Sequence, residues 1–153
     1  MKNIDTILFA TDFSEVSDYV FDYAATLATT YGARLVIIHV VTHHVDLRNF
    51  YVPDVSFEDL DRQVEEGAKS RMADFCKKWA EQFPDVTAYV VTGIPHEEIL
   101  KKAAEENASM IVMGTHGRQG FEHFLFGSTA ERVVKLSTCP VMTVRSPHPP
   151  GDE

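Results

Sequence analysis

The sequence predicts a single α/β domain in which helices cover both faces of a parallel β-sheet. Short apolar segments alternate with segments of helical period along the whole chain. The segment Arg34–Val41 (RLVIIHVV) is apolar almost throughout, as strands buried on both faces are. No repeat or linker interrupts the alternation. This pattern is typical of doubly wound sheets with right-handed crossovers.

Composition limits the class of protein. We expect residues 1–145 to form one domain and residues 146–153, which are polar and rich in proline, to form a loose tail. The formal net charge of −9 argues against a nucleic-acid polymer as the main partner, although a nucleotide needs only a local positive field. No apolar run approaches the ~20 residues of a membrane span, so we expect a cytoplasmic protein. Cys76 and Cys139 are expected to be buried free thiols.

The first half of the chain contains two strands and two helices. Ile4–Ala10 is the first expected strand, and Ser14–Tyr31 is an amphipathic helix that ends at Gly32. Arg34–Val41 is the second strand, and Thr42–Val55 is an irregular connection.

A long helix is expected from Ser56 to Phe83, closed by Pro84. Its expected buried stripe consists of Leu60, Val64, Ala68, Phe75, Trp79 and Phe83.

The second half repeats the alternation. Val86–Thr92 is the third strand, and the next helix begins at Pro95, a residue suited to the first helical position, and ends near Asn107. Ser109–Met113 is the fourth strand, Ser128–Leu136 the fourth helix and Cys139–Arg145 the fifth strand. Ligands of such sheets bind at the carboxyl ends of the strands.

Two glycine-rich corners follow the fourth strand. Gly114 and Gly117 allow backbone amides to approach a ligand, and Gly127-Ser128-Thr129 opens a helix with unpaired N–H groups and two hydroxyls. An alternative is that the glycines only turn the chain while Ser128 and Glu131 form a capping box. Because both corners follow one strand, we favour a phosphate site. The Gly-Lys-Ser/Thr loop and the G-x-G-x-x-G fingerprint are absent.

The glycine-rich corners and several other segments of the chain resemble those of a known family. The pattern G-x2-G-x9-G-S/T, together with ATDFSE, IIHV, VTGIPHEEIL and CPVMTVR, resembles the nucleotide-binding universal stress proteins over the whole chain. The resemblance implies an adenine nucleotide alpha hydrolase-like sheet of strand order 3-2-1-4-5, with ATP across the ends of strands 1 and 4. It also implies a homodimer through the fifth strand, at Val141, Met142, Thr143 and Val144.

The resemblance further implies roles for single residues. Asp12 matches the acid that contacts the ribose, although Asp12 with Glu15 also fits a capping box at the first helix. Val40 matches the residue whose backbone contacts adenine, although it also fits a plain core position. The predicted nucleotide-binding residues are Ala10, Thr11, Asp12, Val40, Met113, Gly114, His116, Gly117, Arg118, Gly127, Ser128 and Thr129.

Other charged groups leave alternatives open. Arg118 is either a phosphate contact or a solvated loop residue, and the same holds for His116. A divalent cation, Mg²⁺ or Mn²⁺, is compatible with the phosphates, and Asp12 or Ser128 could approach it. His39 is expected to be a hydrogen-bonded core group, and the pair His43-His44 a solvated loop.

Three functions follow. The first is a nucleotide-dependent sensor or switch in the stress response, acting on an unknown protein partner. The second is a slow or partner-stimulated ATPase, for which the sequence offers no convincing general base or P-loop lysine. The third is a dimeric scaffold with a vestigial site, against which the retained glycine corners argue.

Overall fold

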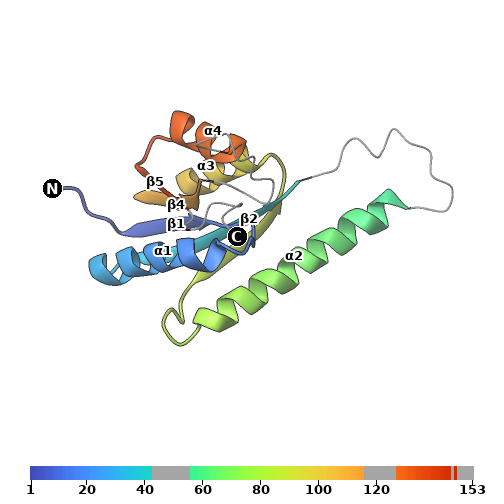
Figure 1. Cartoon of the computed structure of the whole chain (residues 1–153), viewed down its shortest axis with the longest axis horizontal. Helices are drawn as coiled ribbons and strands as arrows, with labels where there is room; N and C mark the ends of the chain where they lie inside the picture. The colour runs from blue at the N-terminus through green and yellow to red at the C-terminus, as the bar shows by residue number, and fades with distance from the viewer. Residues whose placement is uncertain (43–55, 116–126, 146, 148–153) are drawn as a thin grey trace.

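The computed structural model describes residues 1–42, 56–115, 127–145 and 147 of the chain. Strands and helices alternate in these ranges (Figure 1). None of these helices combines the length and the apolar character that crossing a membrane requires. The elements are β1 (Thr6–Ala10), α1 (Ser17–Tyr31), β2 (Arg34–Val41), α2 (Phe57–Trp79), β3 (Thr87–Thr92), α3 (Pro95–Glu105), β4 (Met110–Gly114), α4 (Ser128–Leu136) and β5 (Val141–Val144).

All five strands run parallel in the order β3-β2-β1-β4-β5, which confirms the predicted fold class and strand order. The central strand β1 pairs with β2 from Thr6↔Arg34 onward and with β4 from Ile7↔Met110 onward. The chain therefore builds outward from β1 to β3 and then returns to the other side of β1. This reversal places the topological switch point between the carboxyl ends of β1 and β4.

Each face of the sheet carries its own core and its own pair of helices. Ile7 and Phe9 of β1 pack with α1 and α2, where the rings of Phe9 and Phe21 lie 5.2 Å apart. Leu8, which points to the opposite face, packs with α3 and α4 through Ile99 and other apolar residues. Figure 1 shows α1 and α2 on one side of the sheet and α3 and α4 on the other. Both faces of the sheet are thus covered by helices.

Several boundaries differ from those predicted. β1 begins at Thr6, two residues later than expected. α1 begins at Ser17, later than expected, because residues 12–14 form a hydrogen-bonded turn before the helix. α2 ends at Trp79, five positions before Pro84, so the proline does not close it. Strands β3, β4 and β5 also differ by one or two residues at their ends.

The predicted buried stripe of α2 is wrong in its first half. Leu60 is 41% exposed and Val64 is 48% exposed, whereas Ala68 and Met72 are buried. Figure 1 shows the first turns of α2 standing clear of the sheet, so these side chains have no sheet surface to cover. The periodicity predicted the helix correctly but not how far the sheet extends beneath it.

A charged cluster joins Arg34 of β2 and Tyr89 of β3 to Glu106, the residue that follows the end of α3. Arg34 forms a 2.8 Å ion pair with Glu106, and the Tyr89 hydroxyl donates to the same carboxylate. The ammonium of Lys102 lies 4.0 Å from the centre of the Tyr89 ring. Donation from Tyr89 and then from Arg34 lowers the pKa of Glu106.

Candidate functional site

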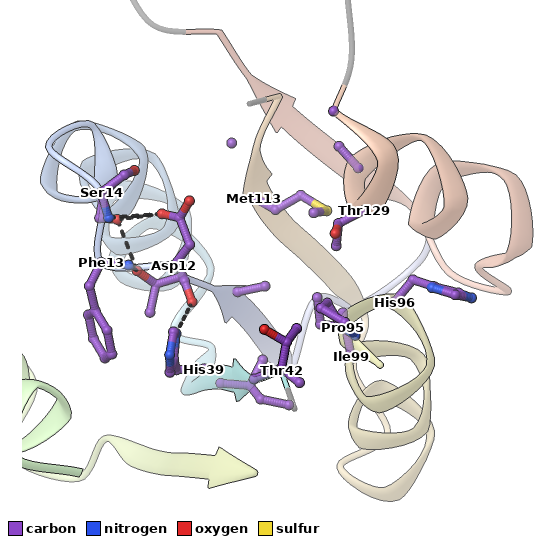
Figure 2. A pocket seen from close by; sticks show the side chains of 18 of the residues that line it. Asp12, Phe13, Ser14, His39, Thr42, Pro95, His96, Ile99, Met113 and Thr129 are labelled. Atoms are coloured by element: carbon purple, nitrogen blue, oxygen red, sulfur yellow. Dashed lines mark hydrogen bonds between the residues drawn. The ribbon is translucent and has the colours of Figure 1, made fainter. Parts of the chain in front are cut away.

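A cleft of about 1120 Å³ lies at the carboxyl ends of the strands, where the switch point predicts a ligand (Figure 2). The predicted residues His116, Gly117 and Arg118 lie outside the described residues. The remaining nine line this one cleft, namely Ala10, Thr11, Asp12, Val40, Met113, Gly114, Gly127, Ser128 and Thr129.

The β1–α1 loop forms one wall of the cleft and positions Asp12. The Oδ1 atom of Asp12 accepts the N–H of Ser14 at 2.9 Å and the hydroxyl of Ser17 at 3.4 Å. The other oxygen, Oδ2, is buried and has no hydrogen-bond partner among the described residues. A buried carboxylate oxygen without a donor is unfavourable, so this atom favours a bound group that donates hydrogen bonds.

The capping-box alternative for Asp12 is wrong. α1 begins at Ser17, its N-cap is Val16, and no side-chain hydrogen bond from a residue that the structure describes caps it. Asp12 instead closes a turn within the loop, which leaves one carboxylate oxygen for other use.

Every polar group of Thr11 takes part in a hydrogen bond. Its N–H donates to the carbonyl of Ile38 at 3.0 Å, and its carbonyl lies 2.8 Å from Nδ1 of His39. Its hydroxyl donates to Ser17 and accepts the N–H of Phe13, each at 3.0 Å. Phe13 adopts a left-handed backbone with φ of 56°, and its ring lies 4.4 Å from that of His39. These contacts fix the loop through side chains.

The start of α4 forms the opposite wall through backbone groups. Gly127 occupies the N-cap position, and within the described residues no side-chain hydrogen bond caps the helix. The capping box predicted as an alternative at Ser128 and Glu131 is therefore wrong, because Ser128 is already the first helical residue. The N–H of Gly127 donates to the carbonyl of Thr115 at 2.6 Å, which brings the helix start against the end of β4. The uncapped N–H groups of the first turn favour an anion.

An apolar surface lies between these walls. Met113 and Ile99 are 5% and 4% exposed, and Val40 and Pro95 line the cleft beside them. In Figure 2 Met113 lies between Asp12 and Thr129. A cleft with a mostly apolar lining and a few placed polar groups is typical of small-molecule sites.

Charge at the cleft is mixed. Arg71 and Arg132 also line it, and they bring positive charge to a protein that is acidic overall. No group of three or more His, Cys, Asp or Glu residues that could hold a metal ion occurs in the described ranges.

Sequence reasoning missed several residues of the cleft. Ile94, Pro95 and Ile99 follow the end of β3, so the rule about strand ends could have found them. Phe13 carried no signal, because its position depends on a left-handed turn and on a ring contact with another strand. His39 is hydrogen-bonded as expected, but it also lines the cleft.

The chain is similar to known proteins along most of its length. The profile of the Universal stress protein family matches residues 3–145. Universal stress protein MJ0577 of Methanocaldococcus jannaschii is 30% identical over 91% of this chain and 93% of its own length. The solved structure of MJ0577 superposes on this chain with a TM-score of 0.82, and the match covers 96% of this chain and 99% of the MJ0577 chain. Universal stress protein YxiE of Bacillus subtilis is 32% identical over 91% of this chain and 97% of its own length.

Two more distant structures were solved with nucleotides. A universal stress protein in complex with cAMP is 23% identical, with a TM-score of 0.60 over 94% of this chain and 98% of that chain. A universal stress protein from Archaeoglobus fulgidus in complex with dAMP is 20% identical, with a TM-score of 0.64 over 91% of this chain and 96% of that chain.

Proposed function

Because the chain belongs to the universal stress protein family, we propose that it binds ATP in the cleft and that occupancy switches its affinity for a protein partner in the stress response. One observation carries this proposal. A buried carboxylate oxygen without a partner and an uncapped helix start form opposite walls of one cleft, with an apolar surface between them. These three features suit the ribose, the phosphates and the base of a nucleotide.

Asp12 is proposed to accept the ribose hydroxyls. Its Oδ1 atom is occupied by Ser14 and Ser17, so Oδ2 is the oxygen that remains for the sugar. Hydrogen bonds from hydroxyls to a carboxylate contribute more than those between neutral groups, about 1.5–3 kcal/mol each.

The start of α4 is proposed to bind the phosphates. Ser128 and Thr129 offer backbone N–H groups and two hydroxyls at the positive end of the helix dipole, directly after the N-cap Gly127. Gly114 lies beside them at the end of β4, and from the sequence pattern His116, Gly117 and Arg118 complete this corner.

Adenine is proposed to lie on the apolar surface near Val40, Ile99 and Met113. The cAMP and dAMP complexes of the two distant relatives support an adenine nucleotide as the class of ligand. A divalent cation, Mg²⁺ or Mn²⁺, fits only as a companion of the phosphates, because Mg²⁺ commonly uses one or two carboxylates together with phosphate oxygens. Asp12 or Ser128 would be its protein contact.

We also propose that β5 mediates a homodimer. β5 is an edge strand of the described sheet, and Val141, Met142 and Thr143 are only partly buried there. An apolar edge strand is prone to pair with another strand. A monomeric mass by light scattering at micromolar concentration would contradict this assignment.

Mass spectrometry of the nucleotide that co-purifies tests the central proposal, followed by calorimetry with ATP, ADP, AMP, cAMP and GTP. We expect ATP to bind and GTP to bind at least about tenfold more weakly, a difference of 1.4 kcal/mol. Repeating the titration with EDTA tests the cation. Absence of a bound nucleotide together with absence of heat on adding ATP and Mg²⁺ would refute the proposal. A phosphate-release assay on the protein that binds ATP distinguishes a switch from an ATPase.

A further inference from the structure

We infer that His39 is a positioning residue of this site, which holds the Thr11 peptide so that Asp12 presents its carboxylate to the sugar. The inference rests on the proposed nucleotide binding and extends it to a residue on the neighbouring strand. His39 lies near the carboxyl end of β2, and Figure 2 shows its bond to the loop that carries Asp12.

The contact between His39 and Thr11 fixes a peptide plane. Nδ1 of His39 lies 2.8 Å from the carbonyl oxygen of Thr11. Because a carbonyl oxygen only accepts, Nδ1 carries the proton. The peptide bond is planar, so fixing this carbonyl also fixes the N–H and the Cα of Asp12. The N–H of Thr11 is bound to Ile38 at 3.0 Å, so β2 holds the peptides on both sides of Thr11.

Losing the donor on His39 therefore displaces Asp12. Without this donor the carbonyl of Thr11 is free to turn toward water or another donor, and the planar peptide carries Asp12 with it. The Oδ1 contacts to Ser14 and Ser17 lie after this peptide and cannot restore its orientation.

His39 also supports the loop through its ring. Phe13 adopts a left-handed backbone, which is unfavourable for an aromatic residue, and its ring packs 4.4 Å from that of His39. The two contributions are separable by substitution. His39→Phe keeps a ring of similar size and removes the donor. His39→Asn keeps an N–H close to the position of Nδ1 and removes the ring.

The experiment compares ATP with 2′,3′-dideoxy-ATP in full-length wild type and in both variants by calorimetry. Wild type should bind ATP about tenfold or more tightly than the dideoxy analogue, because a carboxylate bond to a hydroxyl is strong. The ratio of the ATP affinity to the affinity for the dideoxy analogue should stay within about threefold of the wild-type ratio in His39→Asn. His39→Phe should lower the ratio to nearly one by weakening ATP alone. A purely structural role would weaken both nucleotides equally and leave the ratio unchanged.

Each other outcome counts against the inference. If His39→Phe prefers ATP to the dideoxy analogue as strongly as wild type does, the inference is overturned. It is also overturned if His39→Asn loses this preference to the same extent as His39→Phe. If wild type binds ATP without preferring it to the analogue, Asp12 does not bind the sugar and the inference falls while nucleotide binding stands. If wild type binds no ATP, the proposed function itself fails. If His39→Phe does not fold, His39→Gln replaces it. The amide of glutamine reaches past the Nδ1 position, so this variant should also lose the preference for ATP over the dideoxy analogue.

Discussion

The two walls of the cleft are built by different means. The β1–α1 loop is fixed by side chains, with Thr11, Asp12, Ser17 and His39 joined by hydrogen bonds of 2.8–3.4 Å. The start of α4 is fixed by backbone contacts, and no side chain from the described part of the chain caps it. One wall can therefore be altered atom by atom through substitution, whereas the other is best probed by changing the charge beside it. This difference predicts which nucleotide parts each substitution affects.

The largest effect is expected at the α4 wall from Ser128→Asp. A carboxylate at the first helical position repels phosphates but interacts favourably with the helix dipole. We expect ATP affinity to fall about hundredfold, since a like charge near 4 Å costs several kcal/mol at a partly exposed site. Adenosine, which has no phosphate, should bind as before, and the melting temperature should not fall.

Ser128→Asn is the matched neutral control for this variant. Calorimetry should show that its ATP affinity stays within about tenfold of wild type, a loss below 1.4 kcal/mol. An equal loss of ATP and adenosine in Ser128→Asp would contradict a phosphate site at this helix.

At the other wall, Asp12→Asn should weaken ATP and adenosine alike. The amide keeps an oxygen for Ser14 but removes the charge that strengthens the bonds to the sugar hydroxyls. We expect about a tenfold loss for both ligands, measured by calorimetry. Asp18→Asn, which alters an exposed ion pair with Lys78 outside the cleft, should change neither affinity. A loss confined to ATP would place Asp12 at the phosphates instead.

A smaller contrast concerns stability. Thr11→Val keeps the shape of the side chain but leaves the N–H of Phe13 and the hydroxyl of Ser17 without this partner, so urea unfolding should show a loss of about 1 kcal/mol. Thr129→Val, the matching change at the wall built from backbone, should cost less than about 0.5 kcal/mol. Equal losses at both positions would remove the distinction between the walls.

The smallest effect is expected at the charged cluster far from the cleft. The lowered pKa of Glu106 means that its stabilising contribution is complete above its ordinary value of 4.5 and is lost as pH falls through the folded value. Glu106→Gln should therefore lower the free energy of unfolding at pH 7, and the difference from wild type should shrink toward pH 3. Denaturant unfolding across this range measures the effect, and ATP affinity at pH 7 should not change.

The sequence predicted the parallel α/β fold well, because hydrophobic period and the order of elements are local signals, whereas the strand order was predicted through the family resemblance. It placed Asp12 and the glycine corner at strand ends for the same reason, and both line the cleft; the ribose role of Asp12 came from the family resemblance and stays a prediction. It did not predict that α1 starts three residues late, because the turn at Asp12 competes with the helix for the same residues. The sequence also did not assign His39 to the cleft. The hydrogen bond of His39 reaches from β2 to Thr11, which follows β1, and a contact between two strands leaves no local signal in the sequence.

The position of β1 in the middle of the sheet has a consequence for the order in which the site can form. β1 and β2 are complete once residue 41 is made, but the partner on the other side of β1 begins only at Met110. At typical synthesis speeds the ribosome needs on the order of 5–10 s to cover that interval. During this time the growing chain has the wall that carries Asp12 but neither the end of β4 nor α4. The nucleotide proposed for this site would therefore act on the chain only after nearly all of it has been synthesised, and it would stabilise the finished protein without guiding its early folding.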